Sequence, residues 1–325
     1  MKIIAIKAIK GFLANGRSSN KIQRTFKFSK FCYSLFRGIL LIGISFIIVY
    51  PLLMKLSSAF MHPIDMHDAT VNWVPRHFTL MNFRVAIDEM DYMVAFVNSF
   101  LLSSGLSLLE LFVCTTVGYG FARFKFRGSN LLFAMVILTL LIPPQMIMLP
   151  LFLNFRFFTI FGLLETPGIN LIGSPVPLIL LAATGMAARN GLFIYVARQF
   201  FGGMPKDLEE AAYIDGAGPL KTFFKIMLPN ATAGALVIFV FAFVWRWNDL
   251  FYVDLLLRGR RDLLALSLRW MNDLVIRLEG PAIAGTYVSL VNAAAMLLYI
   301  APLLIFYAFL QKHFIESIER TGIVG

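Results

Sequence analysis

Hydrophobic residues gather in long uninterrupted segments along this chain, and short polar connections separate them. Each segment covers the roughly 20 residues that a helix needs to cross a ~30 Å hydrocarbon layer. Helix is expected because lipid cannot satisfy free backbone N–H and C=O groups. The pattern predicts an all-α polytopic membrane protein with six transmembrane helices, over residues 35–60, 94–121, 131–154, 175–200, 231–257 and 287–310.

Composition agrees with a membrane location. Hydrophobic residues make up 59% of the 325 residues and charged residues only 14%, and the mean hydropathy is +0.77. A soluble domain of this length has too little interior to hide that much apolar surface. We therefore expect a basic N-terminal tail over 1–34, a transmembrane domain over 35–313 and a C-terminal tail over 314–325.

The distribution of charge predicts the orientation. Residues 1–34 carry lysines and arginines without any acid, and the connection after the second segment adds three more basic residues. The long loop 61–93 is acidic. Cytoplasmic loops retain positive charge, so both termini are expected in the cytoplasm. The connection between the fifth and sixth segments does not fit this orientation, since it would lie outside and yet carries Arg258, Arg260, Arg261, Arg269 and Arg277.

The formal net charge of +11 does not point to nucleic acid. Most of the excess lies at inner membrane boundaries, where anionic lipid head groups are the natural partner. A metal site is not expected either, because His62, Asp65, His67 and Asp68 include neither a cysteine nor a helical i,i+4 histidine pair. Cys32 and Cys114 lie at or inside the membrane and are expected to be packing residues.

The cytoplasmic connection 202–230 is more than a turn. Its first half has helix-forming character over 206–214, with acidic residues in the first turns, where they suit the positive end of a helix dipole. Gly216 tolerates the left-handed backbone that ends a helix, and Pro219 can start the next one. A helix, a glycine turn and a second helix are predicted on the cytoplasmic face.

This loop resembles the EAA loop of binding-protein-dependent ABC importers. The resemblance rests on Glu210-Ala211-Ala212, Gly216 and Ile226, with Leu228-Pro229 at the expected spacing. The stretch 204–217 resembles the carbohydrate-importer version of the loop, and weaker similarities to the maltose-type small permease follow in order along most of the chain: Trp73-Val74-Pro75, residues 78–83, Asn98-Ser99, residues 118–124, Pro143-Pro144, residues 162–164 and Trp247-Asn248-Asp249.

The resemblance implies a bacterial inner-membrane permease subunit. It would form half of a pathway with a second homologous permease, dock on two ATPase subunits and receive substrate from an extracytoplasmic binding protein. The expected ATPase-coupling residues are Glu209, Glu210, Ala211, Ala212, Asp215, Gly216 and Ala217. A connector with no docking role is the alternative interpretation of the loop.

The chain is not expected to be an enzyme or to hold a cofactor. It contains no Gly-Lys pair, so the phosphate-binding P-loop is missing, and ATP and Mg²⁺ belong to the expected partner ATPase. The C-terminal tail is similar to tails that approach the ATPases in this family, although a frayed terminus explains it equally well.

Charged residues inside membrane segments are costly and indicate function. Arginine forks pair with carboxylates, and aromatic faces stack on sugar rings. Candidate residues for the substrate path are Arg189, Asn190, Arg246, Trp245, Trp247, Asn248 and Asn154. They suit an acidic uronate oligosaccharide of the alginate type. Alternatively the arginines form internal ion pairs with Glu110 or Asp249, and the cargo is a neutral malto-type oligosaccharide or glycerol phosphate.

Two other classes of protein compete with the importer permease. An ion-coupled secondary transporter would take up its substrate without ATP. A membrane-embedded lipid enzyme would need a catalytic cluster that the sequence does not show. Co-purification with an ATPase subunit discriminates among the three.

Overall fold

The computed structural model is helical through nearly all the residues that it describes. Its backbone covers residues 2–322 except 69, 72, 160–167, 259, 261 and 280, and side chains are described from residue 30 on, apart from those gaps and residues 32, 67, 272, 274–286 and 313–322. Within these residues only isolated bridges have strand character, Met61 with Phe78 and Phe158 with Ile169. The all-α fold class is confirmed.

The chain divides into two compact units, Met1–Ser57 and Ser58–Gly325. The first unit contains all but the last two residues of α1 (Lys2–Ala59), a single helix that runs through the expected boundary between residues 34 and 35. Its apolar part, Tyr33–Ala59, is long and hydrophobic enough to cross a membrane, and most of its residues are exposed. Apolar side chains that no protein surface covers suit a lipid environment.

The second unit contains the remaining elements. In chain order they are η1 (Pro63–His67), α2 (Met81–Glu89), α3 (Tyr92–Arg123), α4 (Ser129–Thr139), η2 (Pro144–Ile147), α5 (Met148–Arg156), α6 (Val176–Ala183), α7 (Asn190–Gly202), α8 (Asp207–Ile214), α9 (Pro219–Thr222), η3 (Phe223–Met227), α10 (Leu228–Asn230), α11 (Thr232–Trp247), α12 (Leu250–Leu256), α13 (Leu264–Glu279) and α14 (Pro281–Gly322).

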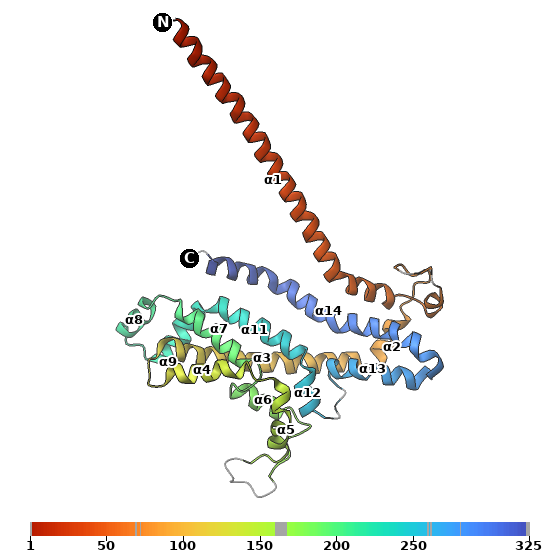
Figure 1. Cartoon of the computed structure of the whole chain (residues 1–325). Helices are drawn as coiled ribbons and strands as arrows, with labels where there is room; N and C mark the ends of the chain where they lie inside the picture. The colour runs from red at the N-terminus through yellow and green to blue at the C-terminus, as the bar shows by residue number, and fades with distance from the viewer. Residues whose placement is uncertain are drawn as a thin grey trace. The chain divides into compact units, whose positions relative to one another are not determined.

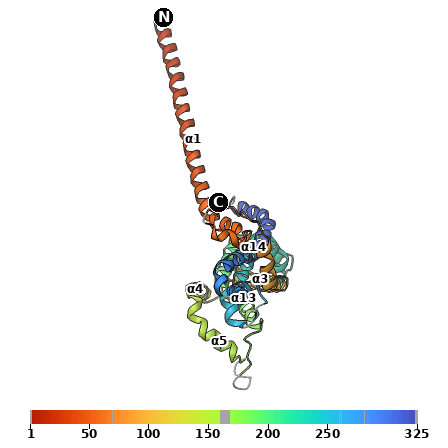
Figure 2. The same cartoon turned by 90° about the vertical axis from the view of Figure 1, so that its right-hand side faces the viewer.

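The long helix α3 is the axis of the second unit. It packs against α7 and α11, and Figure 1 shows these helices side by side, with α8 and α9 near one end of α3 and α2 and α13 near the other. Gly118 brings α3 and α7 together, because a Cβ there would lie 2.4 Å from the Cβ of Ala197. Figure 2 shows α5 on one flank of the unit, away from α14.

The described residues contain three helices that could each cross a membrane alone, namely those over Tyr33–Ala59, Tyr92–Arg123 and Tyr287–Lys312. Two bent pairs raise the number to five if each pair is one span. One pair joins Ser129–Thr139 to Pro144–Arg156 at 96°, and the other joins Pro219–Asn230 to Thr232–Trp247 at 79°. A polytopic helical fold is therefore clear, with three to five candidate spans.

The fourth and fifth apolar segments differ from the uninterrupted helices expected over 175–200 and 231–257. Over 175–200 the chain forms α6 and α7, because Gly185 adopts a φ of +72° just after α6 ends. This left-handed conformation cannot continue a right-handed helix. The fifth segment breaks between α11 and α12, where the Asp249 carboxylate accepts a hydrogen bond from the N–H of Tyr252.

Candidate functional site

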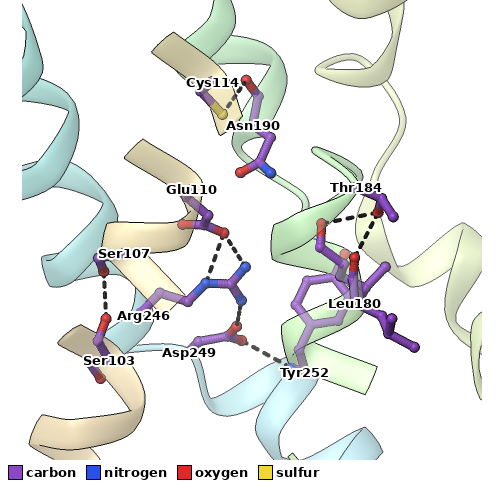
Figure 3. A network of polar contacts seen from close by, with 11 residues as sticks. Ser103, Ser107, Glu110, Cys114, Leu180, Thr184, Asn190, Arg246, Asp249 and Tyr252 are labelled. Atoms are coloured by element: carbon purple, nitrogen blue, oxygen red, sulfur yellow. Dashed lines mark hydrogen bonds and ion pairs between the residues drawn. The ribbon is translucent and has the colours of Figure 1, made fainter. Parts of the chain in front are cut away.

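Three charged side chains meet inside the second unit. Arg246, in the last turn of α11, donates through Nε to Oε1 of Glu110 on α3 at 3.0 Å, and a second guanidinium nitrogen bonds the same carboxylate oxygen. Its Nη1 lies 3.1 Å from Oδ2 of Asp249. The three side chains are at most 13% exposed. Figure 3 shows them converging from α3 and from the break between α11 and α12. We call them the ion triad.

The ion triad borders a cavity of about 470 Å³. The cavity lies beside the break between α11 and α12 and reaches the turn that follows Pro143. Its lining residues are Glu110, Pro144, Gln145, Ala188, Arg189, Phe193, Trp245, Arg246, Asn248, Asp249, Leu250, Phe251 and Tyr252. Aromatic rings and ionised groups therefore share one wall, as expected of a site for a polar ligand with apolar faces.

Arg189 presents its charge differently from Arg246. Its guanidinium carbon lies 4.6 Å from the ring centroid of Trp245, and its side chain is exposed. The Trp245 ring is in turn fixed by Phe193, at 5.4 Å between centroids. A guanidinium on a tryptophan face keeps its N–H donors free for a ligand. Within the described part of the cavity wall, Arg189 is therefore the cation most open to a substrate.

Of the other residues predicted for the substrate path, some line the cavity and some do not. Asn248 lines the cavity, while its amide donates to the carbonyl of Val244 at 2.7 Å. Trp247 is only 3% exposed and packs in the core with Phe243, away from the cavity. Asn190 is fully buried, and its amide has no hydrogen-bond partner among the described residues. Asn154 is exposed on α5, outside the cavity lining.

Sequence reasoning missed part of the cavity lining, namely Pro144, Gln145, Ala188, Phe193, Leu250, Phe251 and Tyr252. Most of them lie at or next to helix breaks, where the chain bends past the cavity. Pro143-Pro144 and Gly185 were the available signals, because both mark an interruption inside an apolar segment. Neither signal says which side of the helix the interruption faces.

The loop over 202–230 has the predicted helix–glycine turn–helix form. α8 ends at Ile214, Gly216 follows with a φ of +77°, and α9 begins at Pro219. Of the residues expected to couple to an ATPase, Glu210, Ala211, Asp215 and Gly216 are exposed, Ala217 is half-buried, and Ala212 and Glu209 are buried. Tyr213 and Ile214 on α8 and Leu220 on α9 are also exposed.

Glu209 turns inward rather than outward. Its Oε1 accepts a hydrogen bond from the hydroxyl of Tyr119 at 2.7 Å, and its Oε2 lies 3.3 Å from Nε of Arg123. Arg123 also donates to the carbonyl oxygen of Met204 at 2.8 Å. Both partners belong to the last turns of α3. Glu209 therefore ties α8 to α3.

The loop that follows α1 has its own ionised cluster. Asp65 is 2% exposed, its Oδ1 lies 2.5 Å from Nδ1 of His77, and its Oδ2 accepts from the His77 backbone N–H at 2.8 Å. Burial alone would raise the pKa of Asp65, but the hydrogen bonds from His77 outweigh it and lower the pKa. Asp68 accepts from Thr70, which also lowers its pKa, and pairs with Arg76 at 2.7 Å. The side chain of His67 lies outside the described residues.

Comparison with known proteins places this geometry in context. Residues 114–320 match the family described as "Binding-protein-dependent transport system inner membrane component". The chain is 30% identical over 306 residues to the osmoprotective compounds uptake permease protein GgtD of Synechocystis, covering 92% of this chain and 95% of the relative. It is 29% identical over 286 residues to the arabinooligosaccharides transport system permease protein AraQ of Halalkalibacterium halodurans, covering 87% and 93%.

A solved structure shares the fold. It belongs to a bacterial ABC transporter involved in the import of the acidic polysaccharide alginate, and one of its chains superposes with a TM-score of 0.71. The match covers 88% of this chain and 98% of the other at 20% sequence identity.

Proposed function

Because the chain belongs to the family of binding-protein-dependent transport system inner membrane components, we propose that it forms one half of the membrane pathway of a carbohydrate-importing ABC transporter. The observation that carries this proposal is the arrangement of α8 in the loop over 202–230. Glu210 and Ala211 are exposed on α8, whereas Glu209 and Ala212 are buried and Glu209 accepts a hydrogen bond from Tyr119 on α3. A helix held in this way offers a rigid surface to an ATPase. Relatives named for sugar uptake support the carbohydrate part.

The proposed assembly contains a second permease, two ATPases and an extracytoplasmic binding protein. Within it, we propose that α6 and α7 together make one crossing, which would raise the five candidate spans to six. Six crossings would put both termini on the same side of the membrane, which we propose is the cytoplasm. The basic residues before the first span and after α3 support this orientation. The exposed apolar surfaces of α4 and α5 would face lipid or the second permease.

The proposed cargo is an acidic oligosaccharide of the uronate type. Arg189 supports this choice, because its guanidinium, stacked on Trp245 in the cavity lining, is open to a carboxylate in the cavity. Arg246 does not take this role, since Glu110 and Asp249 already engage it. The alginate importer with the same fold is consistent with this cargo.

A neutral oligosaccharide is the second candidate cargo, and the charge balance of the cavity favours it. Arg189 and Arg246 are matched by Glu110 and Asp249, so the ionisable groups of the lining sum to zero. A cavity whose lining carries no net charge does not attract an anionic substrate at long range. The two cargoes therefore differ in whether Arg189 contributes to uptake.

Transport assays in proteoliposomes separate these possibilities. The complete transporter, with its binding protein, is supplied with uronate oligosaccharides or with maltooligosaccharides. Arg189→Met keeps the apolar stem and removes the charge. We expect it to reduce uronate uptake by about tenfold or more, equivalent to the ~1.5–3 kcal/mol of a charged hydrogen bond. Wild-type uronate uptake by this variant, or uptake of maltooligosaccharides alone, would favour the neutral cargo.

Two further measurements test the importer class itself. Co-purification of an ATPase subunit and uptake that requires ATP support it, whereas uptake driven by an ion gradient without ATP would identify a secondary transporter. Replacing the exposed Glu210 with alanine should weaken the ATPase complex while the permease still inserts into the membrane. Full coupling in a Glu210→Ala, Gly216→Val double variant would contradict the assignment of the loop.

A further inference from the structure

Glu209 and Glu210 are neighbours in sequence, yet they face opposite sides of α8. Glu210 is exposed, whereas the Glu209 side chain is 11% exposed and faces Arg123, whose own side chain is 7% exposed. A carboxylate and a guanidinium that are both removed from water hold their positions strongly, because losing either partner leaves an uncompensated charge. The exposed Glu210 is therefore available to a partner, whereas the buried pair of Glu209 and Arg123 holds α8 against α3.

The Tyr119 hydroxyl completes this contact from a fixed position. Its ring lies 5.3 Å from Phe201 at the end of α7, and 4.9 Å from Phe223 in the π-helical turn η3. Close packing at Gly118 fixes the same level of α3 against α7. The ring cannot turn without displacing these neighbours. We call Tyr119, Arg123 and Glu209 the clamp.

The clamp and the ion triad lie on one helix. Glu110 precedes Tyr119 by nine residues within α3, which is about 14 Å at 1.5 Å per residue. An α-helix of this length transmits a displacement along its axis without bending. Arg246 and Asp249 attach the same Glu110 to the break beside the cavity. A movement of α8 therefore reaches the cavity wall by way of two buried ionic contacts and the helix between them.

We infer that the clamp is the joint through which the cytoplasmic loop moves α3, and that Glu209 is a positioning residue for coupling rather than part of the ATPase docking surface. The inference rests on the proposed function, since it assumes that an ATPase binds the exposed side of α8. It adds that docking and transmission are separable within one turn of helix. Removing the Glu209 charge breaks transmission and leaves docking intact.

The experiment uses the complete transporter in proteoliposomes. Cys32→Ser and Cys114→Ala remove the native thiols, and Gln145→Cys places a single thiol in the cavity wall, where Gln145 is exposed. A membrane-impermeant maleimide then reports how accessible the cavity is, with and without Mg-ATP and vanadate. With Glu209 present, we expect trapped nucleotide to change the labelling rate at least fivefold, the lower end of typical allosteric coupling.

Glu209→Gln is the test variant, because it keeps the shape of the side chain and removes its charge. We expect the ATPase to co-purify at the wild-type level and vanadate to trap nucleotide, while the labelling rate no longer responds. Tyr119→Phe should reduce the response partly, since it removes one of the two contacts. The exchanged pair Glu209→Arg with Arg123→Glu should restore at least part of it. Asp207→Asn, an exposed charge on the same helix, is the matched control and should keep the full response.

Three results would overturn the inference. One is an unchanged labelling response in Glu209→Gln. Another is loss of ATPase co-purification in that variant, which would make Glu209 a docking residue. The third is failure of the exchanged pair to improve on either single variant. If instead no ATPase co-purifies with the wild-type chain, the proposed function fails before the clamp is tested, so the two failures are distinguishable.

Discussion

Replacing Arg246 with methionine tests the energetic role of the ion triad. Methionine fills a similar volume without charge, so the variant removes the contacts from Arg246 to Glu110 and Asp249 and little else. The two carboxylates do not lose equally. Asp249 still accepts a hydrogen bond from the N–H of Tyr252, whereas Glu110 has no other partner recorded among the described residues.

The size of the effect follows from burial. Glu110 is 3% exposed and Arg246 is 9% exposed, and removing one partner of a buried ion pair costs about 3–5 kcal/mol. We expect Arg246→Met to lower the free energy of unfolding by about this amount. Glu110→Gln should cost less, because Asp249 still neutralises Arg246. The double variant Glu110→Gln, Arg246→Met should recover at least half of the loss, since no uncompensated Glu110 charge remains.

Unfolding of the purified permease in SDS micelles, followed by circular dichroism, measures these differences. Arg189→Met is the matched control, because it removes an exposed cation–π contact worth about 0.5–1 kcal/mol. Equal losses for Arg189→Met and Arg246→Met would refute the reasoning. So would a double variant whose loss is the sum of the two single losses, because a coupled pair cannot be additive.

Three further predictions concern single residues, namely Gly118, Gly216 and Asp65. Gly118→Ala should destabilise the fold by about 1–3 kcal/mol in the same SDS assay, because its Cβ would lie 2.9 Å from the backbone nitrogen of Arg198, whereas Gly120→Ala has open space and should be neutral or stabilising. Gly216→Ala should cost about 1–2 kcal/mol and weaken ATPase co-purification because of its φ of +77°, while Gly218→Ala should not. The Asp65 carboxylate, whose pKa the hydrogen bonds from His77 lower, should protect the loop around His77 from hydrogen exchange at higher pH. This protection should disappear as the pH falls through the lowered pKa and should be absent at all pH values in Asp65→Asn.

Much of the fold could be predicted because the signals are local. A long apolar segment predicts α3, and Gly216 with Pro219 predicts the turn between α8 and α9. The break between α6 and α7 was harder, because Gly185 lies among apolar residues with no polar cluster to mark a turn. Burial in lipid makes the composition of such a break resemble that of a continuous helix, so hydrophobicity alone cannot locate it.

For the candidate site, the sequence could predict some of the residues but not how they are oriented. An ion pair between Glu110 and Arg246 was one of two interpretations of the intramembrane charges, and the structure contains it. The sequence could not show that Trp245 faces the cavity while Trp247, two residues later on the same helix, faces the core. That difference depends on the rotation of α11 against α3. Likewise, nothing in the order of Glu209 and Glu210 says which of them meets α3, because the partner Tyr119 lies 90 residues away in the sequence.

The contact between Glu110 and Arg246 also constrains how the chain is made. The two residues are 136 positions apart, so at 5–20 residues per second the ribosome needs roughly 7 to 27 seconds to supply the arginine after the glutamate. During that interval α3 holds an acidic side chain without its counter-ion. Lipid is a poor host for such a helix, so α3 must wait beside the insertion machinery, or beside a chaperone, until α11 arrives.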